Sequence, residues 1–289
     1  MKLYRIYLLI LFVNLSSCGD DIFDRQPLDK ISDAVVWDDP ALVRAFLTDL
    51  YSRFPYRAFA VTQWHNYTDE ATDSRGNSNS IAQGGASRTN DNLPYWDYVY
   101  LRDINTLLEQ LETSPIDEAQ KRQMEGEARV IRAVYYFEMQ KRYGGVPLVD
   151  VVLDPFGSID SRFTSRSTEE AIADFIDVEL NTAADLLSDS AEPKGRINKW
   201  TALGYKARAN LWSASIAKYG SLQLDGLVGI PVSRADEFFQ KASAASHAVI
   251  DSERYSLYDK IPDRSENYRN LFLDPQNDEV IFKRIYDGV

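Results

Sequence analysis

The pattern of apolar and polar positions predicts a mainly α-helical protein, and it is clearest between residues 124 and 149. Apolar residues recur there at spacings of three and four, which marks one buried face of a helix: Met124, Ala128, Ile131, Tyr135 and Met139. Gly144 and Gly145 can then adopt the left-handed conformation that ends a helix, and Pro147 prevents its continuation. We therefore expect a long packed helix that stops abruptly before a short apolar segment.

Two acid–base pairs on this helix are spaced one turn apart, with the acid nearer the N-terminus. Glu125 precedes Arg129, and Glu138 precedes Arg142. This order is the favourable one and adds about 0.3 kcal/mol per pair to helix stability. We interpret both pairs as stabilising the helix rather than as catalytic or binding residues.

The same periodicity predicts further helices on both sides of the long one, over residues 41–54, 95–111, 167–187, 200–212 and 233–257. Asp38, Asp39 and Pro40 supply start signals for the first, and Ser167, Thr168 and Glu170 offer capping chemistry for the third. We expect the last to be a capped helix with small residues where neighbouring backbones approach. Residues 278–289 alternate like a strand and predict one at the end of the sequence.

One predicted helix carries a near match to the first helix of a tetratricopeptide repeat, W-x2-L-G-x2-Y, in the letters WTALGYKARANLW. Trp200, Leu203 and Gly204 occupy their positions, but Ala207 stands where tyrosine is expected. Several helical hairpins follow one another along the chain. The predicted fold is therefore mainly α, with tetratricopeptide-like helical hairpins of degenerate sequence joined by long irregular loops.

The longest predicted loop, residues 55–94, has no periodicity and is rich in Gly, Ser, Asn and Asp. Loops of this kind often carry function. It contains the aromatic and polar side chains that bind sugars by ring stacking and hydrogen bonding, and the candidate ligand-binding residues are Trp64, Asn66, Asp69, Asp73, Arg75 and Asn77. Core packing is the alternative for Trp64. We interpret Trp96, beyond the loop, as part of the packed scaffold.

The N-terminus reads as a lipoprotein signal peptide over residues 1–17. Lys2 and Arg5 precede an apolar run at residues 6–13, which is too short to cross a bilayer as a helix. Leu15, Ser16, Ser17 and Cys18 follow and are similar to a bacterial lipobox, so Cys18 is the predicted lipidation site. A stray cysteine in a cleaved signal is the alternative. Residues 18–39 then form a lipidated tether.

Composition supports a globular protein with a substantial core, since 44% of the 289 residues are hydrophobic and 12% are aromatic. Removing residues 1–17 takes away Lys2 and Arg5 and no acid, which changes the formal charge from −12 to −14. The remaining basic residues form no stripe, so nucleic acid is not an expected partner. Cys18 is the single cysteine, and its lipidation leaves no thiol for a disulfide.

Motifs of common enzymes are missing from the sequence: it has no Gly-rich phosphate loop, no HExxH, no GxSxG and no paired CxxC. The two histidines, His65 and His247, lie far apart. Asp69, Glu70 and Asp73 could serve glycoside hydrolysis or hold calcium, but acidic residues in a solvated loop are more common. We expect no catalysis, no metal and no cofactor.

The order GEAR, RA, YYFEMQKRYGG and VPLV in Glu125–Val149 resembles the signature helix of the SusD/RagB family, which comprises glycan-capturing surface lipoproteins of Bacteroidetes. The resemblance implies that residues 40–289 form a SusD-like helical domain whose ligand contacts come from the loop before Trp96. Asp20 and Asp21 are similar to the family's surface-export signal. Chains of this family are longer, so we expect the C-terminal part of the family fold to be missing and the chain to be a fragment or a frameshifted copy.

The function implied by this resemblance is non-catalytic binding of an oligosaccharide or polysaccharide at the cell surface. The protein would be lipid-anchored in the outer membrane and deliver its glycan to a SusC-like TonB-dependent transporter for nutrient uptake. A different class of function is an adaptor lipoprotein whose tetratricopeptide-like surface binds protein or peptide. Peptide-binding relatives within the family keep that alternative open.

Overall fold

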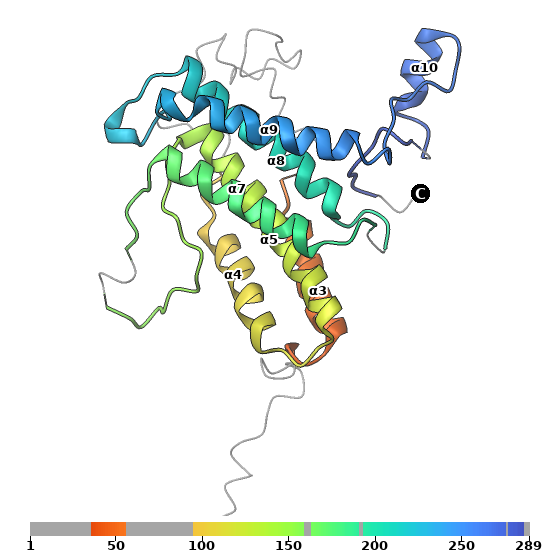
Figure 1. Ribbon diagram of the computed structural model, residues 1–289. Coiled ribbons are helices and arrows are strands. Elements are labelled where there is room, and N and C mark those ends of the chain that lie inside the picture. Colours follow the sequence, from red (N-terminus) through yellow and green to blue (C-terminus); the bar gives the residue numbers. More distant parts are fainter. Residues whose placement is uncertain (1–35, 56–94, 159–162, 191–192, 276, 286–289) are drawn as a thin grey trace, which may run out of the picture.

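A computed structural model of the chain describes residues 36–55, 95–158, 163–190, 193–275 and 277–285. The predicted signal peptide, Cys18, most of the tether and residues 56–94 lie outside these ranges. The α-helices are α3 (Pro40–Ser52), α4 (Tyr98–Thr113), α5 (Glu118–Tyr143), α7 (Glu169–Leu186), α8 (Lys199–Tyr219), α9 (Ala235–Ile250) and α10 (Arg264–Leu271). Two short 3-10 helices, η5 (Leu224–Gly226) and η6 (Val232–Arg234), lie between α8 and α9. The mainly helical prediction is confirmed (Figure 1).

The long helix α5 is the central element of the fold. Every residue of the predicted apolar face is buried, and burial continues around the helix to include Glu127, Arg132 and Glu138. This happens because α5 packs against α3, α4, α7 and α8 rather than against one neighbour. It ends as predicted: Gly144 has φ of +68°, and its N–H donates to the carbonyl of Gln140 at 2.9 Å.

The remaining helices form successive hairpins on either side of α5. Figure 1 shows α3 and α4 beside one part of α5 and α7, α8 and α9 stacked beyond it. Small side chains let α8 and α9 approach closely, as Ala214, Ala217 and Ala242 are all buried. Phe238 fills the space between these helices and α7. The prediction of tetratricopeptide-like hairpins, made from the letters around Trp200, is confirmed in its architecture.

Side-chain caps begin most of these helices. Asp39 accepts a hydrogen bond from the N–H of Ala41 at 2.8 Å, and Thr168 accepts one from Ala171 at 3.1 Å, as their positions predicted. The expected cap of α9 is wrong. That helix continues directly from η6 and has no side-chain cap, and it ends at Ile250 rather than near residue 257.

The predicted strand at the end of the sequence is also wrong for the residues that are described there, 278–285, which are irregular. Their apolar side chains pack onto helices instead of alternating across a sheet. The ring of Phe282 meets that of Phe54 edge-on at 5.8 Å, and Ile281 lies near Gly204 of α8. Helix α10 precedes this segment and stands apart from the helical stack (Figure 1).

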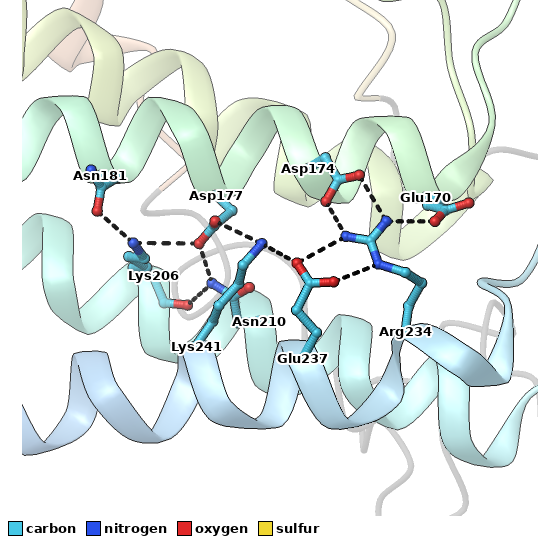
Figure 2. Close-up of polar contacts among 9 residues, drawn as sticks. All are labelled: Glu170, Asp174, Asp177, Asn181, Lys206, Asn210, Arg234, Glu237 and Lys241. Carbon is cyan, nitrogen blue, oxygen red and sulfur yellow. Dashed lines mark hydrogen bonds and ion pairs between the residues drawn. The ribbon is translucent and has the colours of Figure 1, made fainter.

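A network of charged side chains ties α9 to α7 (Figure 2). The guanidinium of Arg234 pairs with Asp174 at 2.7 Å, with Glu237 at 2.9 Å and with Glu170 at 2.5 Å. The hydrogen bonds that Arg234 donates to these carboxylates, to Asp174 foremost, raise the pKa of Arg234. The guanidinium therefore connects two carboxylates of α7 with one carboxylate of α9.

The same network continues along α7 to Asp177 (Figure 2). Lys241 of α9 reaches Asp177 at 3.1 Å, and Lys206 of α8 reaches it at 3.5 Å. Asn210 donates its side-chain N–H to the same carboxylate at 2.8 Å. All three helices of this layer are thus joined by polar contacts as well as by the small-residue packing.

Candidate functional site

The chain that follows α5 is held against the helices by its backbone. Tyr98 of α4 donates its hydroxyl to the carbonyl of Pro147 at 2.8 Å. Tyr136 of α5 accepts from the N–H of Val149 at 2.8 Å and donates to the carbonyl of the same residue at 3.1 Å. Burial raises the pKa of both phenols, so each remains a hydrogen-bond donor at neutral pH. The start of this segment is therefore fixed.

Polar side chains of α4 hold the rest of the segment. Asn105 donates to the carbonyls of Val149 and Val151, both at 3.0 Å. Arg102 donates to the carbonyl of Leu153 at 3.2 Å. Backbone carbonyls that are shielded from water require hydrogen-bond partners, and for this partly buried segment the side chains of α4 supply them.

A buried ion cluster orients those side chains. Arg132 donates from Nε and Nη2 to Oε2 of Glu179 in α7, at 2.8 and 2.7 Å. Its Nη1 donates to Oδ1 of Asn105 at 2.8 Å, which directs the amide of Asn105 toward the segment. Arg129 bonds the other oxygen of Glu179 at 2.6 Å and also pairs with Glu125 at 2.8 Å. The predicted pair of Glu125 and Arg129 is thus confirmed, and it belongs to a larger cluster.

The two glycines of the turn are needed for different reasons. Gly144 adopts a positive φ. Gly145 provides space, since a Cβ there would lie 2.0 Å from the carbonyl oxygen of Ser167. Arg166 completes the turn by donating to the carbonyls of Gly145 at 2.7 Å and Tyr143 at 2.6 Å. The signature sequence therefore folds the chain back along α4 and α5.

This arrangement leaves a cavity of about 300 Å³ between the start of α4 and the anchored segment. Its lining is Trp96, Tyr98, Arg102, Pro147, Val149, Val151, Leu153, Phe163 and Thr164. The walls are mostly apolar and include a few polar groups, which is the composition of small-molecule binding sites. Within the part of the chain that the structure describes, no Asp, Glu or His lines this cavity.

Trp96 is the most exposed aromatic residue at the start of α4, with 47% of its surface accessible. Its ring makes edge contacts with Tyr143 at 5.1 Å and with Tyr98 at 5.7 Å. The backbone beside it is fixed, because Asp97 caps α4 and donates its own N–H to the hydroxyl of Tyr135 at 2.9 Å. A half-exposed indole is therefore held in place at the edge of the cavity.

The interpretation of Trp96 as core scaffold is wrong in this respect. The residue precedes the first residue of α4 and so falls outside the helical stripe that buries Tyr100, Leu101 and Ile104. A tryptophan placed just before an N-cap aspartate was the available signal. Phe163 and the segment 147–153 were also missed as site residues, because only the fold brings them beside α4.

The ligand residues proposed from the sequence lie outside the described residues: Trp64, Asn66, Asp69, Asp73, Arg75 and Asn77. The loop that contains them rejoins the described chain at Tyr95, next to Trp96. Cys18, the predicted lipidation site, also lies outside. No group of three or more acidic, histidine or cysteine side chains suited to a metal occurs in the described ranges, and no helix within them is long and apolar enough to span a membrane.

The described fold is thus a helical scaffold of stacked hairpins with an anchored segment and an aromatic-edged cavity. Residues 24–211 match a SusD-like family described as starch-binding and associating with the outer membrane. Because this match covers more than half of the sequence, the chain belongs to the SusD-like family, and the resemblance to SusD/RagB proteins is confirmed.

Individual relatives agree with this assignment. A SusD-like protein of Bacteroides ovatus is 27% identical over 222 residues, which cover 68% of this chain and 37% of that protein. The crystal structure of a SusD-like protein of Bacteroides fragilis superposes with a TM-score of 0.70 at 26% identity, covering 91% of this chain and 48% of the other. A laminarin-binding SusD-like protein shares the fold, with a TM-score of 0.52, 22% identity and coverage of 79% and 48%. The chain thus spans half or less of the length of these relatives.

Proposed function

We propose that this protein binds an oligosaccharide at the cell surface without cleaving it and delivers it to a SusC-like TonB-dependent transporter for nutrient uptake. The observation that carries the proposal is Trp96, whose half-exposed indole stands at the edge of an apolar cavity on a rigid helical frame. The description of the family as starch-binding supports it. So does the name of the laminarin-binding structural relative.

The physical basis is preorganisation. Sugar rings present apolar faces that stack on an indole, while their hydroxyls need donors such as Arg102 and Thr164 at the cavity wall. The site is held before ligand arrives, because buried contacts from Asn105 and Arg132 fix the segment that forms the wall. Binding then requires less ordering of the protein, which lowers the entropy cost of association. The cavity is open and small, so we expect modest affinity.

The residues proposed from the sequence complete this picture. The loop with Trp64, Asn66, Asp69, Asp73, Arg75 and Asn77 leads into Tyr95 and Trp96 along the chain, and we propose that it adds polar contacts to the same ligand. Cys18 would carry the lipid that keeps the protein on the outer membrane, since each buried methylene contributes about 0.8 kcal/mol. Substituting Cys18 by Ser should move the protein from the membrane fraction to the soluble fraction.

The test is isothermal titration of the chain lacking its signal peptide against laminarin oligosaccharides, malto-oligosaccharides and peptides. We expect saturable binding of a glycan and a loss of about 1 kcal/mol, or about fivefold in affinity, in Trp96→Ala. Trp96→Phe, which keeps a ring, should retain most of the affinity. Tyr219→Ala removes an exposed aromatic ring that does not line the cavity and is the matched control.

Three results would contradict the proposal. Equal glycan affinity in the wild-type protein and Trp96→Ala would remove this residue from the site, and binding of peptides alone would favour the adaptor function. Release of new reducing ends from a bound polysaccharide would show catalysis. Delivery to a transporter is tested by co-purification with a large outer-membrane β-barrel from the native host.

A further inference from the structure

A second cavity, of about 730 Å³, lies between α5, α8 and residues 282–284. It shares no lining residue with the cavity beside Trp96. Its volume is within the range of about 300 to 1,000 Å³ that small-molecule sites occupy. The proposed function does not involve this cavity.

Cations dominate the lining of the cavity. Lys141, Arg208, Lys283 and Arg284 contribute four positive charges, and Glu138 is the one acid among the described lining residues. The carboxylate of Glu138 is already occupied, at 2.6 Å by Lys141 and at 2.8 Å by Arg142 of the same helix. The lining is thus net positive in a chain whose formal charge is −12. Such a local reversal of charge attracts anions.

Arg208 is the cation best placed to meet a ligand. It is exposed on α8, and it forms no ion pair with any residue of the described ranges. Lys283, which also lines the cavity, donates to the carbonyl of Pro275 at 2.9 Å, which leaves its charge without a carboxylate among these residues. Two cations from different elements of the lining can therefore receive negative groups. Guanidinium and ammonium groups bind carboxylates and sulfates through charge-assisted hydrogen bonds.

The cavity also has an aromatic wall. Trp212 is 38% exposed, and its ring is held by an edge contact with Phe137 at 6.4 Å. Leu211, beside it on α8, is exposed as well. An accessible indole next to cations matches a ligand that has both an apolar ring face and negative substituents. Acidic sugars have this combination, since the pyranose face stacks while the carboxylate or sulfate pairs.

We propose that this cavity binds an anionic saccharide, with its acidic group between Arg208 and Lys283 and a sugar ring on Trp212. An acidic peptide fits less well. Peptides commonly bind by adding a strand to a sheet edge or by laying a helix into an apolar groove. Among the described residues there is no strand to extend, and the charged walls of this cavity are not an apolar groove.

The experiment is isothermal titration of the full mature protein with sodium trigalacturonate. The fully methyl-esterified trisaccharide has the same rings without the charge, and a sulfated galactotriose separates sulfate from carboxylate as the preferred group. We expect the acidic sugars to bind and the ester to bind at least about tenfold more weakly, because it lacks the charge-assisted contacts. Raising the salt concentration from 0.05 to 0.5 M should weaken the acidic ligands alone, as screening predicts.

Matched variants locate the binding. Arg208→Gln should weaken trigalacturonate by about tenfold, and Trp212→Leu should weaken it as well. Arg264→Gln removes a charge from an 86% exposed side chain outside the cavity and should leave the affinity unchanged. Urea unfolding of each variant establishes that it is folded. Since Arg208 is exposed, its substitution should not alter stability.

Three outcomes would overturn this inference, and they differ from failure of the proposed function. Unchanged trigalacturonate affinity in Arg208→Gln would exclude the cavity. Loss of that affinity in Trp96→Ala with no loss in Arg208→Gln would place the acidic sugar in the first cavity. Tighter binding of hexaglutamate than of any sugar, sensitive to Arg208→Gln, would replace the saccharide by an acidic peptide.

Discussion

Arg132 of α5 places two of its N–H groups on a single carboxylate oxygen of Glu179 in α7, and both side chains are buried, at 5% and 4% exposure. The third nitrogen of the guanidinium bonds Asn105 and the carbonyl of Asp150. One buried cation thereby connects three helices to the segment that forms the wall of the first cavity. The carboxylate of Glu179 also forms an ion pair with Arg129. The buried charges of Arg132 and Glu179 are therefore both compensated.

Removing the carboxylate from this cluster should be strongly destabilising. Glu179→Gln leaves Arg132 with its charge buried and unmatched, and we expect a loss of about 3 kcal/mol in the free energy of unfolding. Glu125→Gln is the control, because Glu125 is partly exposed and, among the described residues, forms an ion pair with the outer arginine, Arg129, alone. It should cost less than about 0.5 kcal/mol. Urea denaturation measures both, and equal losses would contradict the central role of Glu179.

The turn after α5 should not accept a side chain at its second glycine. In Gly145→Ala the new Cβ would meet the backbone at Ser167, which cannot move without shifting the chain, and we expect a loss of about 3 kcal/mol. Gly204→Ala should do the opposite. It lies inside α8 with its nearest Cβ contact at 3.9 Å, so alanine should stabilise the helix by about 0.5–1 kcal/mol. Thermal unfolding followed by circular dichroism distinguishes the two.

The network between α7 and α9 should depend on salt. Arg234→Gln leaves Glu170, Asp174 and Glu237 close together without their shared cation, which should cost about 1–2 kcal/mol at low salt. The cost should shrink in 0.5 M NaCl because screening weakens the repulsion. Arg264→Gln, which breaks an exposed pair at 3.4 Å, should cost less than about 0.5 kcal/mol in both. If the loss of unfolding free energy in Arg234→Gln were the same at both salt concentrations, the cause would instead be lost packing of the arginine side chain against Phe238.

The same network predicts a dependence on pH. Hydrogen bonds from Lys241, and then from Arg234, lower the pKa of Glu237. A carboxyl whose pKa is lower in the folded state contributes stability above its unfolded pKa and loses it as the pH falls through the folded value. The difference in unfolding free energy between wild type and Glu237→Gln, below about 1 kcal/mol for a half-exposed group, should be present at pH 7 and smaller at pH 3.

A matched acid tests that interpretation. Glu112 is exposed and has no ion pair among the residues that the structure describes. Glu112→Gln should therefore leave the unfolding free energy unchanged at either pH. If the effect of Glu237→Gln persisted undiminished at pH 3, its ionisation would not be the cause.

Local signals in the sequence predicted the helices and the stop at Gly144 well, because periodicity and turn chemistry act over a few residues. The Glu125–Arg129 pair was visible for the same reason. Its third member, Glu179, was not, since it lies 50 residues further along the chain and meets Arg129 only after α5 and α7 pack.

Longer-range packing also explains the errors. The alternation at residues 278–285 is that of a strand, yet no partner strand is present in the described ranges, and Phe282 packs onto helices instead. Trp96 was assigned to the core from its neighbours in sequence, whereas the helix begins just beyond it and leaves the ring half exposed. Both cavities are assembled from elements distant in sequence, and periodicity carries no information on such assembly.

The wall segment at residues 147–153 is attached through its main chain: the helices bind the carbonyls of Pro147, Val149, Val151 and Leu153. Leu148 also packs its side chain against the core, whereas Val149, Val151 and Leu153 line the cavity and are held through these carbonyls. Mutation can therefore replace Val149, Val151 or Leu153 and reshape the cavity without detaching the segment from its supports. Such an arrangement is evolvable, since new ligand preferences can arise by substitution at these positions while the helical scaffold stays the same.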